Sequence, residues 1–208
     1  FDETYYGISA EDRLEGALRL SRFDQISKEA AGYRLISEEC EYSCTADDNY
    51  LADSNGFEGR HSETTFGTFT EMTIEDPEGN KYSGFWWQTC PMVKEIDFEE
   101  CGRKALERAV RQMNPKKRRS GSYRMVVEST VASRLVAPVI TALNASSIQQ
   151  KMSFLDGSLG RQVFSERLTL KDLARTAGKS GSRLFDTEGT ATKDATIIGN
   201  GIVNQYFV

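Results

Sequence analysis

The segment between Tyr33 and Cys90 is the part of the sequence that most constrains the fold. It alternates apolar and polar residues in short runs rich in Thr, Phe, Tyr and Ile, and the turn sequences DSNG (53–56) and DPEGN (76–80) interrupt these runs. Such turns between alternating runs are typical of β-hairpins, whose strands are antiparallel. The sequence therefore predicts an antiparallel meander over Tyr33–Cys90.

Segments with helical spacing flank the predicted meander. Ser9 and Asp12 have the spacing of a capping box, and the apolar positions that follow predict a helix over about Ala10–Glu29. Asp97 is a good N-cap for a second helix, which ends before Pro115. No βαβ alternation is legible, so we predict an α+β fold of antiparallel sheets with packed helices.

The second predicted helix is followed by the basic run Lys116–Arg119 and by Ser120-Gly121-Ser122. We place a domain boundary here, with an N-terminal α+β domain over 1–114 that ends in the linking helix and a β-rich domain over 115–208. The basic run follows a helix C-terminus, where cations complement the negative end of the helix dipole. We therefore interpret it as a helix-end feature rather than as a nucleic-acid site.

The second domain is predicted to contain a strand at Tyr123–Val127 and a long apolar helix over 130–144. Pro138 lies inside this helix, so the helix is either kinked there or restarts with Pro138 in its first turn. Near the end of the chain, Gly199-Asn200-Gly201 predicts a hairpin bend. The chain stops on a strand that needs a partner, and we therefore expect the C-terminal domain to be incomplete.

Charge and composition exclude several function classes. The net charge of the 208 residues is −5, which argues against direct binding to nucleic acid. No apolar run approaches the roughly 20 residues that span a bilayer, so no membrane contact is expected. Four cysteines are sparse for this length, which predicts a reducing, cytoplasmic location.

The cysteines and the single histidine are the first residues to consider as metal ligands. Cys40 and Cys44 lie four residues apart on a predicted strand and would share one face, and Cys90 or His61 would complete a zinc site. Closed zinc sites usually contain two such pairs, and only one is present here. We interpret these residues as ordinary thiols and as a solvated strand histidine.

Asp186 and Glu188, followed by Gly189, are the candidates for acid–base chemistry. In a strand the two carboxylates would share one face and would suit a metal or an acid–base pair. In a turn, the Asp carboxylate would instead accept hydrogen bonds from the backbone. We favour the turn.

The order of motifs in the second half of the chain resembles the TldD/PmbA family, and within it the PmbA (TldE) branch. That family has an SFL…LG stretch, an LT strand and a signature of the form fDdEGv.T. The corresponding signature positions, whose roles are unproven, include Ser153, Phe154, Leu155, Gly160, Asp186, Glu188 and Gly189. Upstream, DSNGFEGRHSE resembles the family's hairpin and GRKALERAV its linking helix. Family members extend further at both ends, so this chain is expected to be the central fragment of a longer one.

The resemblance also implies which residues would be catalytic. TldD-type subunits carry HExxxH on the helix that corresponds to the apolar segment, with two histidines on zinc and the glutamate as general base. Along that helix, the first His, the Glu and the second His fall on Ala137, Pro138 and Ala142. None of these side chains binds a metal or moves a proton. The resemblance thus implies no catalytic residue, metal ligand or cofactor in this chain, with zinc expected in a TldD-like partner.

Three functions follow as hypotheses. The first is a PmbA/TldE-like non-catalytic subunit of a TldD-type zinc metallopeptidase complex that processes or degrades small or unfolded peptides in the bacterial cytoplasm. The second is an independent metallopeptidase or hydrolase with ligands in the missing C-terminal part. The third is a binding module that modulates DNA gyrase or a toxin–antitoxin system.

Association is a separate expectation. The apolar segment presents Leu135, Val139, Ile140 and Leu143 beside small alanines, which permits close packing. We predict a large interface with a TldD-like subunit or in a homodimer. The alternative is that the missing part of the chain covers this face.

Overall fold

The computed structural model describes residues 1–21 and 32–207. The chain divides into two compact units: Phe1–Lys117 with Thr176–Thr190, and Arg118–Arg175 with Ala191–Val208. The segment Thr176–Thr190 thus belongs to the first unit although it follows much of the second in sequence.

The first unit contains a three-stranded antiparallel sheet in the order β1-β2-β3. Its strands are β1 (Arg34–Ala52), β2 (Glu58–Glu75) and β3 (Lys81–Cys90). The turns form as their sequences predict, because Asp53 Oδ1 accepts hydrogen bonds from the backbone N–H groups of Asn55 and Phe57. The predicted meander is confirmed.

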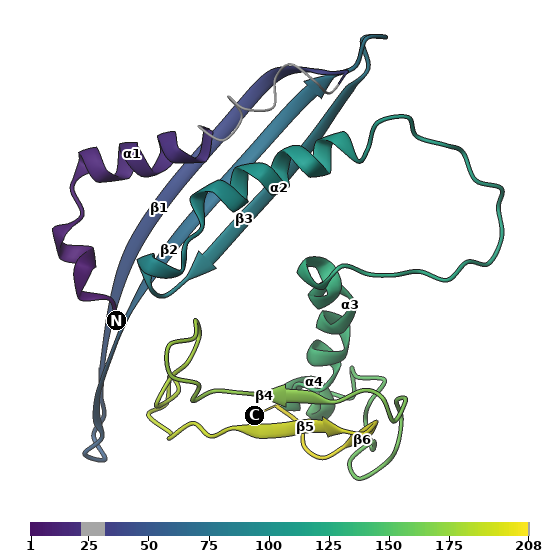
Figure 1. Cartoon of the computed structure of the whole chain (residues 1–208). Helices are drawn as coiled ribbons and strands as arrows, with labels where there is room; N and C mark the ends of the chain where they lie inside the picture. The colour runs from purple at the N-terminus through teal and green to yellow at the C-terminus, as the bar shows by residue number, and fades with distance from the viewer. Residues whose placement is uncertain (22–31, 208) are drawn as a thin grey trace. The chain divides into compact units, whose positions relative to one another are not determined.

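Helices α1 (Ala10–Ser21) and α2 (Phe98–Val110) lie on one face of this sheet (Figure 1). The Ser9 hydroxyl accepts the backbone N–H of Asp12 at the start of α1, which confirms the capping box. Asp97 caps α2, because its carboxylate accepts the Glu100 N–H at 2.9 Å. The rest of the first predicted helix, up to Glu29, lies outside the described residues.

The core of the first unit lies between the sheet and the helices. The even-numbered residues of β2 from 64 to 74 are buried, which leaves the odd-numbered ones on the other face. Met72 and Ile74 pack against Ala105, Leu106 and Ala109 of α2. The first unit also contains short 3-10 helices at Glu3–Gly7 and Val93–Glu95.

The β1–β2 hairpin continues as a two-stranded ribbon beyond the end of β3. Strand β3 pairs with β2 only from Phe66 onward, whereas β1 and β2 pair as far as Ala52 and Glu58. Figure 1 shows this ribbon extending past the three-stranded part of the sheet. Isolated two-stranded ribbons are marginal in water, so the ribbon depends on further packing.

The second unit contains α3 (Ser129–Ala142), α4 (Ala145–Gln149) and an antiparallel sheet in the order β4-β5-β6. Its strands are β4 (Leu170–Asp172), β5 (Ala195–Gly199) and β6 (Ile202–Val203). The predicted hairpin bend is confirmed, because Asn200 and Gly201 join β5 to β6 with φ of 48° and 81°. These left-handed values match a type I′ turn.

Two expectations for this unit are settled by the structure. The predicted strand at Tyr123–Val127 is wrong: these residues have no regular structure and pair with no strand in the described part of the chain. A strand needs a hydrogen-bonded neighbour, and Val126 is instead 90% exposed. Helix α3 begins at Ser129 and continues through Pro138, so it does not restart there.

Candidate functional site

The positions that correspond to HExxxH lie on the second half of α3. Ala137 and Pro138 have hydrocarbon side chains, and Ala142 is buried in the core of the second unit. Helix α3 contains no His, Cys, Asp or Glu, since its sequence is STVASRLVAPVITA. Over residues 1–21 and 32–207, no group of three or more such side chains is placed to hold a metal ion. The residues of α3 therefore do not fit zinc.

The SFL stretch supports the packing of α3. Ser153 Oγ donates a hydrogen bond to the Ala142 carbonyl at 2.5 Å and accepts the Leu155 N–H at 3.0 Å. Leu155 is buried in the core, whereas Phe154 is 75% exposed. Gly160 has φ of 74° and donates its N–H to the Val203 carbonyl. Ser153, Leu155 and Gly160 thus have visible structural contacts.

The residues around Asp186 form a tight turn. Asp186 Oδ1 accepts the backbone N–H groups of Glu188 and Thr190 at 2.9 and 2.8 Å. The Gly189 N–H bonds to the Asp186 carbonyl, and Gly189 has φ of 82°, which favours glycine. The turn interpretation is confirmed, and Glu188 is exposed on it.

This turn packs on the tip of the β1–β2 ribbon, within the first unit. The rings of Phe57 and Phe185 meet edge to face with centroids 5.1 Å apart. A Cβ at Gly189 would lie 2.8 Å from the Phe57 ring, and a Cβ at Gly59 would lie 2.8 Å from the Phe185 ring. Both glycines are therefore needed for this close approach, which adds packing at the tip of the ribbon.

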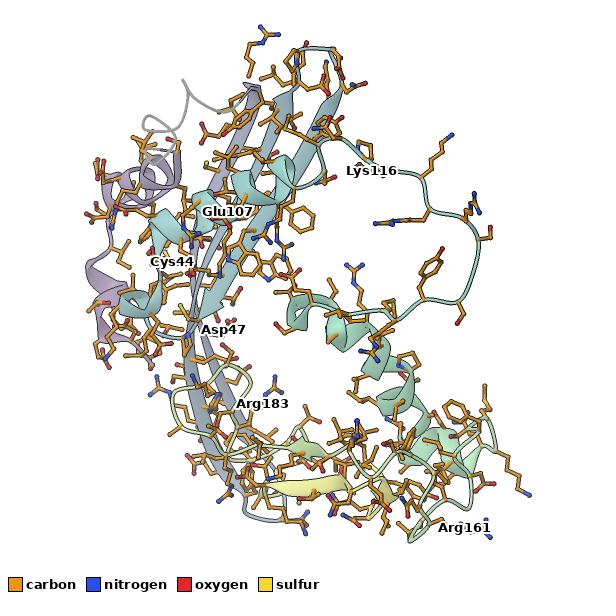
Figure 2. The ribbon with its side chains drawn as sticks, turned by 45° about the vertical axis from the view of Figure 1, so that its right-hand side comes forward. Cys44, Asp47, Glu107, Lys116, Arg161 and Arg183 are labelled. Atoms are coloured by element: carbon orange, nitrogen blue, oxygen red, sulfur yellow. The ribbon has the colours of Figure 1, made fainter. Side chains whose placement is uncertain are left out.

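A pocket of about 270 Å³ lies between the ribbon and the turn. Its lining combines two carboxylates, a guanidinium, aromatic rings and the imidazole of the single histidine. The lining residues are Asn49, Tyr50, Leu51, His61, Glu63, Arg183, Phe185, Asp186 and Thr187. Figure 2 labels Arg183 on the 176–190 segment and Asp47 on the ribbon. All of these residues belong to the first unit.

His61 is less solvated than its sequence context predicts. Its side chain is 21% exposed, and Nε2 lies 3.8 Å from Glu63 Oε2, beyond hydrogen-bond distance. Nε2 is buried without a hydrogen-bond partner in the part of the chain that the structure describes. Sequence reasoning missed this environment because the covering segment lies more than 100 residues further along the chain.

The cysteines have the environments of ordinary thiols. Cys40 and Cys44 lie on β1, and these two, Cys90 and Cys101 are all free. Burial raises the pKa of the Cys40 thiol to about 11 and also raises the pKa of Cys101. A raised pKa disfavours the thiolate, which is the form that binds metals.

Comparison with known proteins decides the family. A family model described as the PmbA/TldA metallopeptidase central domain matches residues 5–113, and one described as the C-terminal domain matches residues 120–208. The chain belongs to the PmbA/TldD family. The two family models and the structural neighbours described below confirm the predicted α+β fold and the predicted resemblance to the PmbA/TldE branch.

Two relatives and two solved structures show the extent of the similarity. A metalloprotease PmbA homolog of Haemophilus influenzae is 29% identical over 53% of this chain and 24% of its own length. The PmbA homolog of Buchnera aphidicola subsp. Acyrthosiphon pisum is 22% identical over 95% of this chain and 45% of its own. A Bacteroides thetaiotaomicron structure named as a modulator of DNA gyrase is 35% identical with a TM-score of 0.91, covering 100% of this chain and 47% of that one.

TldE from Thermococcus kodakarensis has the same fold, with a TM-score of 0.70, 16% identity, and coverage of 100% of this chain and 46% of that one. The chain therefore spans less than half the length of each of these proteins. In the described residues no helix has the length and apolar character needed to cross a membrane.

Proposed function

We propose that this chain is part of a PmbA/TldE-like, non-catalytic subunit of a TldD-type zinc metallopeptidase complex. The complex would process or degrade small or unfolded peptides in the cytoplasm. The observation that carries the proposal is the chemistry of α3, where Ala137, Pro138 and Ala142 stand at the positions of HExxxH.

The defects on α3 are independent of one another. A catalytic zinc site needs three protein ligands, and two of the expected ones are alanines here. The expected general base is Pro138, which has no titratable group and cannot donate a backbone hydrogen bond within the helix. Zinc and the base would therefore come from a TldD-like partner.

The surface of α3 supports the association that this role requires. Of the four residues of the predicted association face, Leu135 and Ile140 are 57% and 41% exposed. Leu143 is instead fully buried in the core of the second unit, and Val139 packs against that core, so these two residues do not belong to the exposed face. Small residues beside Leu135 and Ile140 permit a close approach of another chain. A stable complex would bury more than about 1,200 Å² in total.

The experiment is affinity purification of the full-length protein from its native source, followed by mass spectrometry and light scattering. We expect a stoichiometric chain that carries HExxxH, or a homodimer when that chain is absent. A monomer at micromolar concentration in the presence of a purified TldD-like chain would refute the subunit role. Stoichiometric recovery of DNA gyrase without such a chain would favour the binding-module hypothesis instead.

A further inference from the structure

We propose that the pocket between the β1–β2 ribbon and the Asp186 turn binds a primary ammonium group carried by a peptide. The ammonium belongs either to a lysine side chain or to a free N-terminus, which share the same recognition chemistry. This inference rests on the proposed function only for its choice of peptides as the ligand class.

The charge of the pocket favours a cation. Glu63 and Asp186 line it with two carboxylates, against the one guanidinium of Arg183. With a neutral imidazole on His61, the charged groups of the lining sum to a negative charge.

The neighbouring strand increases this negative charge. Asp47 of β1 lies directly opposite Glu63 of β2, and like charges in that position destabilise a strand pair. Arg60, a basic residue of the ribbon, is already bound to Asp48 through two hydrogen bonds. An added cation at Glu63 would therefore reduce a repulsion that the ribbon contains.

The hydrogen-bonding groups suit an ammonium in particular. An ammonium has three N–H donors and no acceptor, and the carboxylates of Glu63 and Asp186 are acceptors. With its proton on Nδ1, His61 presents Nε2 as a third acceptor, which is buried and has no partner in the described residues. Nε2 of His61 lies 3.8 Å from Glu63 Oε2, so an ammonium that is hydrogen-bonded to this oxygen would also lie close to Nε2.

The walls of the pocket suit the aliphatic part of such a ligand. The rings of Tyr50 and Phe185 line it, and aromatic rings attract ammonium groups within about 6 Å by cation–π interaction. A volume of about 270 Å³ lies just below the roughly 300–1,000 Å³ usual for small-molecule sites, so the pocket fits one side chain or terminal residue rather than a large cofactor.

The pocket is also preformed on one side. The two backbone hydrogen bonds to Asp186 and the contact of Phe185 with Phe57 fix the turn before a ligand arrives. Fixing the walls in advance lowers the entropy that binding must overcome.

The test uses the full-length protein with isotope-labelled histidine and the NMR signal of His61, assigned by its loss in His61→Gln. Three tripeptide amides serve as probes: acetyl-Ala-Lys-Ala, Ala-Ala-Ala with a free N-terminus, and acetyl-Ala-Ala-Ala as the neutral control. We expect at least one of the two amine peptides to shift the His61 signal in a saturable way, and the neutral peptide to leave it unchanged. The peptide that binds identifies the source of the ammonium.

The matched variants are Glu63→Gln in the pocket and Glu71→Gln, further along β2 and opposite Phe85 of β3. We expect Glu63→Gln to weaken binding at least tenfold and Glu71→Gln to leave it unchanged, with native tryptophan fluorescence in both. No shift with either amine peptide at 10 mM (about 50-fold excess over a typical sample), an equal shift with the neutral peptide, or unchanged affinity in Glu63→Gln would overturn the proposal. The assay needs neither zinc nor a partner, so its failure leaves the subunit role to its own experiment.

Discussion

Replacing Gly84 by alanine is expected to force α2 away from the sheet. A Cβ at this position of β3 would lie 2.3 Å from the Ala109 nitrogen and 2.4 Å from the Ala105 oxygen. It would also lie 2.8 Å from the Arg108 carbonyl carbon. All three are backbone atoms of one helix, so the clash is not relieved by turning a side chain.

The cost follows from the shift that the helix must make. Ordinary van der Waals contact begins at about 3.4 Å, so α2 has to move outward by roughly 1 Å, which disturbs the close packing around the fully buried Ala105 and Ala109. Overpacking of a core costs about 1–3 kcal/mol. Because rigid backbone is involved, we expect Gly84→Ala to lower the free energy of unfolding by about 3 kcal/mol.

Urea unfolding followed by tryptophan fluorescence measures this loss. Trp86 and Trp87 are the two tryptophans of the 208 residues, and Trp86 lies beneath Lys104 and Arg108 of α2. With a slope of about 2 kcal/mol per M, the midpoint should fall by about 1.5 M.

The control is Gly7→Ala, where an added Cβ meets no atom within 4 Å in the described part of the chain. We expect its midpoint to stay within about 0.25 M of the parent, as for ordinary surface substitutions. A Gly84→Ala midpoint equally close to the parent would refute the packing argument.

The remaining predictions concern a cap, a turn and a thiol. Asp97→Ala removes the N-cap of α2 and should lower the free energy of unfolding of the first unit by about 1 kcal/mol in the same urea assay, whereas no change would contradict the cap. The side-chain amide of Asn80, and to a smaller extent its backbone N–H, donate hydrogen bonds to the Asp76 carboxylate and lower its pKa. The contribution of the Asp76 carboxylate to the free energy of unfolding is therefore complete above the unfolded pKa of about 3.9, and it is lost as pH falls through the lower folded pKa. Asp76→Asn should therefore flatten the acid side of a plot of unfolding free energy against pH. An unchanged plot would contradict this. Burial raises the pKa of Cys40 to about 11. Iodoacetamide at pH 8, read by mass spectrometry, should therefore label Cys40 about 100-fold more slowly than a free cysteine, and equal rates would argue against its burial.

Local sequence signals predicted the elements whose stability is local. The Asp53 turn, the Ser9–Asp12 capping box and the Asn200-Gly201 turn each form within a few residues, and their side chains make the hydrogen bonds or backbone angles that the residue types favour. Along β2 the even-numbered residues from 64 to 74 are buried, which is the period of two expected of a strand with one face in the core.

Local residue patterns could not predict the contacts between segments that lie far apart in the sequence. The Tyr123–Val127 segment has strand-like residues, but a strand exists only with a hydrogen-bonded neighbour, which the segment itself cannot reveal. The His61 pocket depends on Phe185 meeting Phe57, a contact across more than 100 residues. The glycines at 59 and 189 are the signal that was available, because each lies where a Cβ would collide with one of these rings.

The most direct test of the central claim is the zinc content and peptide cleavage of the isolated full-length protein after loosely bound ions have been removed. We predict no stoichiometric zinc bound through α3 and no chelator-sensitive cleavage of an unstructured peptide. Cleavage should begin when a purified TldD-like chain is added. Stoichiometric zinc traced to α3, or chelator-sensitive cleavage without any partner, would contradict the assignment as a non-catalytic subunit.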